Sequence, residues 1–390
     1  MKRPIYLDYA AATPLDPAAE RAMRPYQADV FGNPGALHRA GQAASAAVFR
    51  ARRAIAGALG ADYREIFFTG SATEANNMAL RGVAHAALRD GHVKRPKILI
   101  SAIEHESVRE TAHELERECG VEVVEIPVDT MGKINIDRLQ KALDERVILV
   151  SVQFVNSELG IIQPIKEIGE IIRSYKLKAS SSSYPLFHTD AAQAFNYLKC
   201  DMKALGADML TLSAHKIYGP KGIGVLHARC ADLLSPVIVG GGQESGLRSG
   251  TENVPAIVGF AAAVAVAEKT RAKESKRVGK LRDALWKEML KIVPDAELNG
   301  SATERVPNSL NVYFPGRSAQ DLVIELDISG VMASPGTACS SRTAQPSYVI
   351  AALGHSGDRP SASVRFSLGR QTTAAEISQV ARIFKKRFAA

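Results

Sequence analysis

Short apolar runs alternate with longer amphipathic segments through the first two thirds of the chain. The apolar runs are IFFT (66–69), KILIS (97–101), VEVVEI (121–126), VILVSVQF (147–154), LFHTD (186–190), MLTLS (209–213) and GVLHA (224–228). Between them, residues 74–91, 106–119 and 165–178 keep the apolar spacing of helices. Strands that alternate with helices in this way predict a mostly parallel sheet covered by helices on both faces.

The pattern changes after about residue 256. We expect one long charged helix over roughly 256–293, strands at NSLNVYF (308–314) and VRFSL (364–368), and a closing helix. Thr373 and Glu376 have the spacing of a capping box for that last helix. The C-terminal third therefore predicts an α+β arrangement.

This change of pattern predicts two domains. We expect a large α/β domain over residues 15–258, and a smaller α+β domain built from residues 1–14 and 259–390. The apolar run at 254–267 is interrupted by Pro255 and is shorter than the ~20 residues that a membrane span needs. We therefore expect a buried helix there and no membrane association.

Composition and charge narrow the function classes. Hydrophobic residues make up 46% and charged residues 23% of the 390 residues, which is typical of a globular protein. The excess of 49 Lys+Arg over 41 Asp+Glu is spread along the chain. Zinc-finger spacing, a basic zipper and an aromatic RNA motif are all absent from the sequence, so we expect no direct nucleic-acid partner and no metal.

Cysteine usage and the N-terminal residues favour a cytoplasmic protein. The four cysteines are widely separated and form no CxxC pair: Cys119, Cys200, Cys230 and Cys339. The first residues, MKRPIYLDYAAATPLD, lack the apolar core of a signal peptide. The Ser180–Ser183 run reads as a loop extension without a predicted function.

The stretch TGSATEANN (69–77) joins a predicted strand to a predicted helix through small residues. The first turn of a helix presents unpaired N–H groups and the positive end of the helix dipole, an arrangement that suits a phosphate. A plain helix cap by Ser71 or Thr73 explains the stretch equally well by itself. The lysine of a Walker loop is missing.

Asp190 and Lys216 follow predicted strands, at the edge where parallel sheets bind their ligands. Singly, Asp190 reads as a helix cap and Lys216 as a surface lysine. Together with the phosphate loop they are the parts of a pyridoxal 5'-phosphate site. Asp190 would keep the pyridine nitrogen protonated, and Lys216, beside His215, would bind the cofactor covalently.

Motifs along nearly the whole chain make this hypothesis specific. They are YLDYAAATP, FGNPGALHRAG, FFTGSATEANN, SAIEHESV, NSELGIIQP, HTDAAQA, SAHKIYGPKGIG, GLRSGTENVP, GTACSS and RFSLGR. Together they resemble the cysteine desulfurases of the class V aminotransferase superfamily, of the iron-sulfur-cluster type with a long catalytic-cysteine loop.

The resemblance implies a fold and an activity. The expected fold is the α/β fold type I of pyridoxal-phosphate-dependent transferases, assembled as a homodimer. The expected activity converts L-cysteine to L-alanine and takes the sulfur as a persulfide on Cys339. An acceptor, such as an iron-sulfur scaffold protein, would then receive the sulfur for cluster assembly or tRNA thiolation.

The resemblance also implies roles for individual residues. His105 would stack on the cofactor ring and transfer protons, although a buried core histidine is the simpler interpretation of that residue alone. The other implied residues are Ala72, Thr73, Ser213 and His215 at the phosphate, with Thr251 from the partner subunit; Asn156 and Gln193 at the ring substituents; and Asn33 and Arg365 at the substrate carboxylate.

Several motifs depart from the family pattern. Residues 33–36 are NPGA where the family usually has NPSS, and residues 156–158 are NSE in place of NNE. Residues 243–246 are QESG in place of QERG, and residues 334–339 are SPGTAC in place of SSGSAC. None of these changes removes a catalytic group.

Other functions remain as alternatives. A selenocysteine lyase or a class V aminotransferase would use the same scaffold. A docking scaffold without cofactor would not need Lys216, Asp190, His105 and Cys339. A nicotinamide enzyme would need a G-x-G-x-x-G stretch that opens a helix after a first strand, and the sequence has none.

Overall fold

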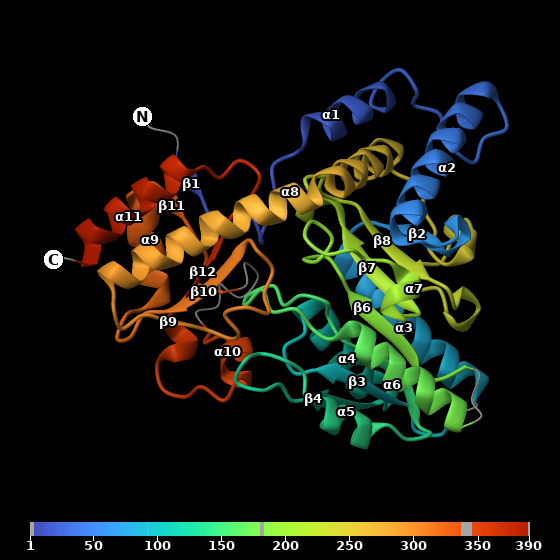
Figure 1. The fold of residues 1–390 in the computed structure, drawn as a ribbon. Helices are drawn as coiled ribbons and strands as arrows, with labels where there is room; N and C mark the ends of the chain where they lie inside the picture. Colours follow the sequence, from blue (N-terminus) through green and yellow to red (C-terminus); the bar gives the residue numbers. More distant parts are fainter. Residues whose placement is uncertain (1–3, 92, 180–182, 337–344, 389–390) are drawn as a thin grey trace.

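A computed structural model describes residues 4–91, 93–179, 183–336 and 345–388 of the chain (Figure 1). Cys339 and most of the Ser180–Ser183 run lie outside the described residues. Among the described residues, no helix has the length and apolar character required to cross a bilayer.

The centre of the molecule is a seven-stranded sheet with the order β2-β8-β7-β6-β5-β3-β4. Its strands are β2 (Ile66–Thr69), β3 (Lys97–Ser101), β4 (Glu122–Ile126), β5 (Val147–Ser151), β6 (Leu186–Asp190), β7 (Met209–Ser213) and β8 (Gly224–Ala228). All neighbours are parallel except β8, which runs antiparallel to both β2 and β7. The predicted mostly parallel sheet is confirmed.

One predicted strand is longer than the structure shows. Strand β5 ends at Ser151, although the N–H groups of Val152 and Phe154 still donate to the His188 and Asp190 carbonyls of β6. Gln153 donates its backbone N–H to the Glu104 side chain at 2.8 Å instead of to a neighbouring strand. The run therefore keeps its contact with β6, and its pairing with β3 ends at Ser151.

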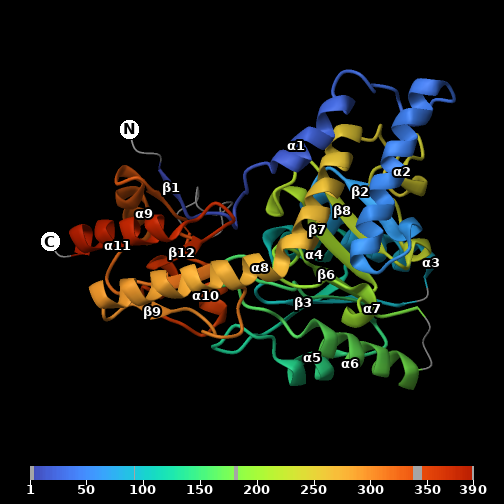
Figure 2. The ribbon, with the colours of Figure 1, turned by 45° about the horizontal axis from the view of Figure 1, so that its top comes forward.

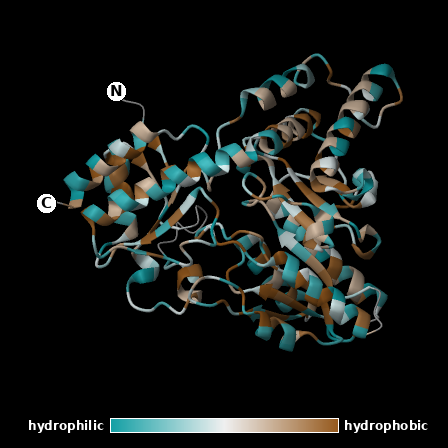
Figure 3. Cartoon of the chain, in the orientation of Figure 1, coloured by the Kyte–Doolittle hydropathy of each residue, from teal (hydrophilic) through white to brown (hydrophobic). Residues whose placement is uncertain are grey.

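Helices cover both faces of the sheet. Ahead of the long helix they are α1 (Pro17–Met23), α2 (Arg39–Leu59), α3 (Ala72–Asp90), α4 (Glu106–Cys119), α5 (Ile136–Ala142), α6 (Ile165–Lys178) and α7 (Met202–Leu205). Successive side chains of a strand enter opposite cores. Phe67 belongs to the core that includes residues of α3 and α4, and Phe68 belongs to the core that includes residues of α2 and α6. The strands consist largely of apolar residues, and much of the sheet is accordingly brown in Figure 3.

Helix α2 was not predicted from the sequence. Its buried face carries Val48, Ile55 and Leu59 as well as small residues such as Ala44 and Ala47, so the sequence does hold a helical spacing that the prediction overlooked. The predicted helices at 106–119 and 165–178 match α4 and α6 residue for residue.

A second group of elements contains both ends of the chain. Strand β1 (Ile5–Tyr6) pairs with β11 (Val331–Met332), and β12 (Ser363–Ser367), β10 (Ser309–Tyr313) and β9 (Glu297–Leu298) form an antiparallel sheet. Helices α9 (Ala319–Ile328), α10 (Tyr348–Ala352) and α11 (Ala374–Phe388) accompany them. The predicted capping box of α11 is confirmed, because Thr373 and Glu376 exchange hydrogen bonds between side chain and backbone.

Helix α8 (Val254–Ile292) connects the two groups of elements (Figures 1 and 2). Its first part, up to Ala267, belongs to the core under the large sheet, and its second part, from Val278, packs with β10, β12 and α11. The predicted domain boundary at residues 258 and 259 lies inside this helix. It stays a prediction, and we propose from the packing that the division falls between Ala267 and Val278.

Candidate active site

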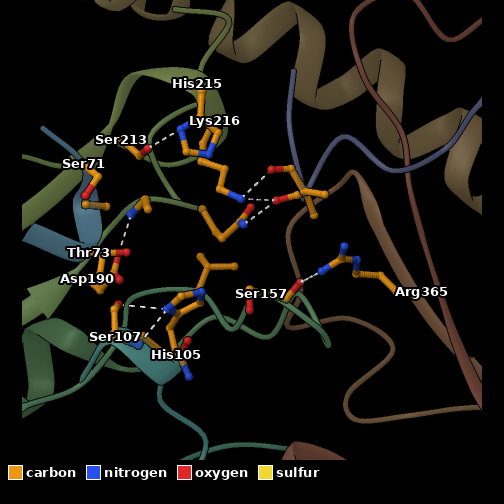
Figure 4. Close-up of a pocket in the computed structure, with 17 residues that line it drawn as sticks. Ser71, Thr73, His105, Ser107, Ser157, Asp190, Ser213, His215, Lys216 and Arg365 are labelled. Carbon is orange, nitrogen blue, oxygen red and sulfur yellow. Dashed lines mark hydrogen bonds between the residues drawn. The ribbon is translucent and has the colours of Figure 1, made fainter. Parts of the chain in front are cut away.

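A pocket lies at the carboxyl ends of β6 and β7, beside the first turns of α3 and α4 (Figure 4). Residues Ala10 and Ala11 of the N-terminal segment and Arg365 of β12 complete its wall. The pocket therefore combines residues from both groups of elements, and nearly all the side chains expected from the sequence can be placed relative to it.

The start of α3 forms one wall. Ser71 caps the helix by accepting a hydrogen bond from the Glu74 N–H at 3.0 Å, and Ala72 and Thr73 follow at the pocket surface. Gly224 packs against this turn so closely that a Cβ atom on it would lie 2.5 Å from the Ser71 carbonyl carbon. The helix start and the adjoining strand therefore fit only with glycine at residue 224.

Ser213 and His215 line the pocket together with the start of α3. The Ser213 hydroxyl and His215 Nδ1 are 3.0 Å apart, and both residues line the pocket. Burial, together with the positive charges of Lys216 and Lys221, lowers the pKa of His215 to about 4. The four residues predicted for the phosphate on this chain are thus brought together: Ala72, Thr73, Ser213 and His215.

Asp190 lies at the end of β6 and is held on both carboxylate oxygens. Oδ2 accepts a hydrogen bond from Asn76 Nδ2 at 2.8 Å, and Oδ1 accepts one from the Ala192 N–H at 2.9 Å. Asn76 also donates to Ser107. These contacts fix the direction in which the carboxylate faces the pocket.

Lys216 ends the short turn that follows β7 (Figure 4). Its Nζ donates hydrogen bonds to the carbonyl oxygens of Ala10 at 2.7 Å and Ala11 at 2.8 Å. Gln193 also donates to the Ala10 carbonyl, at 2.9 Å. The N-terminal segment therefore contacts two of the residues predicted for the cofactor.

His105 caps α4 and borders the pocket from the opposite side. Its Nδ1 accepts a hydrogen bond from the Ser107 N–H at 3.1 Å, so a neutral ring carries its proton on Nε2. Burial lowers the pKa of His105, and the charge of Lys216 lowers it further against the opposing effect of Asp190. A neutral imidazole with a donor at Nε2 is the expected form near pH 7.

Arg365 lies across the pocket from Asp190 (Figure 4). It is 2% exposed, pairs with Asp8 Oδ1 at 2.7 Å and donates to the Ser157 carbonyl at 2.9 Å. Its Nε is buried, and the described part of the chain supplies no hydrogen-bond acceptor for it. A small anion entering the pocket would find this guanidinium already oriented.

Three predicted residues do not line the pocket. Asn156 is buried and uses its side chain on backbone groups of Ile103, Glu158 and Leu159, while its neighbour Ser157 borders the pocket. Asn33 and Thr251 are exposed and lie away from it in this chain. Their predicted roles remain untested, as does that of Cys339 outside the described residues.

Some groups that hold the pocket side chains in place were not predicted from the sequence. Asn76 and Ser107 lie within quoted motifs, and a polar residue directly after a capped helix start is a usable signal for each of them. The carbonyl groups of Ala10 and Ala11 gave no signal, because every residue has a carbonyl and only the fold decides where it points.

Comparisons with known proteins agree with this geometry. The family profile described as "Aminotransferase class-V" matches residues 5–380. The protein named "Cysteine desulfurase IscS" of Dictyoglomus turgidum is 40% identical over 378 residues, which cover 97% of this chain and 93% of that protein.

Two solved structures have a similar fold. A "NifS-like protein" superposes with a TM-score of 0.90 at 32% identity and covers 99% of both chains. A structure titled "SspA in complex with cysteine" superposes with a TM-score of 0.79 at 35% identity, covering 93% of this chain and 98% of the other.

Proposed function

The chain belongs to the class-V aminotransferase family, and from this premise we propose that it is a pyridoxal-phosphate-dependent cysteine desulfurase. The predicted transferase fold of type I is confirmed by the family match and by the structural neighbours. The observation that carries the proposal is the meeting of Lys216, Asp190 and the start of α3 in one pocket, with Arg365 facing them.

The pocket residues fit the family's cofactor. The first turn of α3, with Ser213 and His215, offers the donors that an anionic phosphate requires, and Asp190 offers a fixed carboxylate for a protonated ring nitrogen. Lys216 offers the amine that binds an aldehyde. When bound, pyridoxal phosphate supplies an electron-withdrawing ring that stabilises negative charge on the substrate Cα.

Substrate binding and proton transfer are assigned to residues of the chain. Arg365 would bind the α-carboxylate of L-cysteine with its fork of N–H groups, which suits a planar carboxylate. Lys216 would accept and return the proton at the substrate Cα. His105, neutral and carrying its proton on Nε2, would move a proton at the substrate sulfur.

The persulfide step is part of the proposal. The thiolate of Cys339 would attack the substrate sulfur, the carbon–sulfur bond would break, and the bonding electrons would remain with the fragment that is protonated to L-alanine. The sulfur would stay on Cys339 as a persulfide for an acceptor protein, such as an iron-sulfur scaffold.

The assembly and the location are further parts of the proposal. A homodimer would bring Thr251 of the partner subunit to the phosphate, which accounts for the exposure of this residue in the single chain. Asn33 would contribute to substrate binding in the same assembly. A cytoplasmic location is proposed because a reducing compartment keeps the Cys339 thiol free to act as a nucleophile.

The test measures L-alanine and sulfide formed from L-cysteine in the presence of a thiol reductant. The wild type is expected to form both, whereas Cys339→Ala should bind the cofactor and lose at least 90% of the sulfide, on the order of the effect of removing a nucleophile. Equal sulfide release by the two proteins would favour a lyase that forms no protein persulfide. Pyruvate or glutamate-linked turnover would favour an aminotransferase.

A further inference from the structure

The N-terminal segment Ala10–Thr13 makes an unusual set of contacts with the turn that carries Lys216. The carbonyl oxygens of Ala10 and Ala11 both accept hydrogen bonds from Nζ, at 2.7 and 2.8 Å. The segment is itself fixed, since the Ala10 N–H donates to the Ser367 hydroxyl at 2.8 Å. The two carbonyls are therefore held in place independently of the lysine.

Thr13 binds the backbone on both sides of Lys216. Its hydroxyl donates to the His215 carbonyl at 2.8 Å and accepts a hydrogen bond from the Tyr218 N–H at 2.8 Å. Its own N–H donates to the same His215 carbonyl at 3.0 Å. Thr13 is 5% exposed, so water does not readily replace these bonds.

The backbone beyond Lys216 needs such support. Tyr218 has a φ of 67°, a left-handed conformation that a bulky side chain rarely adopts. Its ring lies 4.1 Å from the Arg370 guanidinium carbon, and its hydroxyl accepts a hydrogen bond from the Arg370 N–H at 2.7 Å. The strained turn is thus held by contacts from distant parts of the sequence.

We propose that residues Ala10–Thr13 form a lysine cradle, in which Thr13 is a positioning residue for Lys216 and the two alanine carbonyls hold its amine while it is not bound to the cofactor. The inference rests on the proposed function, because it assumes that Lys216 binds pyridoxal phosphate. In that reaction the amine condenses with the cofactor aldehyde and one water leaves. During turnover the amino group of the substrate replaces Lys216, and the lysine must return afterwards.

The test compares Thr13→Val with Thr13→Ser in the full-length chain stripped of cofactor. Pyridoxal 5'-phosphate reports covalent capture by Lys216, measured as cofactor fixed by borohydride against time. Pyridoxamine 5'-phosphate has no aldehyde and reports the pocket alone. We expect Thr13→Val to slow capture about tenfold at unchanged affinity for pyridoxamine phosphate, and Thr13→Ser to restore the rate.

Thr270→Val is the matched control. Thr270 lies in α8, and its hydroxyl donates a hydrogen bond to the Val266 carbonyl at 2.8 Å, away from the pocket. This variant should lose stability and capture the cofactor at the wild-type rate. Thr13→Ala replaces the valine variant if that protein does not fold.

The outcomes separate the cradle from the proposed function. Capture by Thr13→Val at the wild-type rate would overturn the cradle, and so would an equal loss of affinity for both cofactor forms. A wild type that captures no pyridoxal phosphate would overturn the proposed function and the cradle together. Slowed capture that serine restores supports both.

Discussion

Histidines near the site show how burial sets the charge of a single residue. His188 lies in β6 with 0% of its side chain exposed, between Ser151 and Thr211. Burial lowers its pKa to about 4, although Asp190 opposes the shift. His188 and Asp190 are two residues apart in β6 and so point to the same face of the strand, but only Asp190 lines the pocket.

This lowered pKa predicts a pH-dependent stability. Unfolded His188 titrates near pH 6.5, so below that pH the unfolded chain binds the extra proton and the folded chain does not. Stability is therefore kept above pH 6.5 and lost as the pH falls towards 4. Between pH 7 and pH 5 we expect His188 to account for about 2 kcal/mol of lost unfolding free energy.

Urea unfolding of the wild type and His188→Gln at pH 7 and pH 5 checks this expectation. The variant should be less stable at pH 7 and less sensitive to acid. An identical loss of stability on acidification in both proteins would contradict it.

At the scale of elements, the site depends on the close contact between β8 and the start of α3. Strand β8 begins at Gly224, directly beside the first turn of α3. The sequence predicted both elements and the loop between β2 and α3, but it did not predict their contact. Antiparallel pairing of β8 with β2 and β7 brings its first residue to the predicted phosphate loop.

Gly224→Ala tests this contact. The added Cβ would lie within 2.7 Å of the Ser71 carbonyl group, so the helix start must shift away. We expect the affinity for pyridoxal phosphate to fall at least tenfold, on the order of one lost charge-assisted hydrogen bond, as measured by equilibrium titration.

Gly57→Ala in α2 is the control for that experiment. A Cβ there would meet no heavy atom within 4 Å, and alanine should stabilise the helix by roughly 0.5–1 kcal/mol without affecting the cofactor. Wild-type affinity in Gly224→Ala would show that the close approach does not shape the phosphate site.

At the scale of the whole molecule, Asn33 and Thr251, which were predicted for the site, are exposed on the single chain. Apolar side chains near Asn33 are exposed as well. Phe31 and Leu37 are 80% and 91% exposed on the loop that carries Asn33. Exposed aromatic and aliphatic residues beside a predicted functional residue favour a covered interface. This observation supports the homodimer of the proposed function.

Phe31→Asp combined with Leu37→Asp should therefore produce monomers. Sedimentation is expected to give a mass near the chain's 41.8 kDa for this variant and about twice that for the wild type. The monomer should also retain less cofactor, because the partner's Thr251 would be lost. Ile328→Asp, at a residue 75% exposed on α9, is the control and should stay dimeric. A monomeric wild type would contradict the proposed assembly.

The sequence by itself determined the strands of the large sheet, the helices α3, α4, α6 and α8, and the family. These features follow from local periodicity, capping residues and motifs that are continuous in the chain. It also named most pocket residues. Asp190, Lys216 and the loop at 69–77 were found by their place at the ends of predicted elements, and the others came from the family resemblance.

The tertiary structure alone decided the contacts between distant segments. It joined Ala10, Ala11 and Thr13 to the Lys216 turn, and Asp8 to Arg365, across hundreds of residues. It also turned the Asn156 side chain towards backbone groups and away from the pocket. Such contacts depend on backbone carbonyls and on the direction of side chains, and both are fixed only when the elements pack.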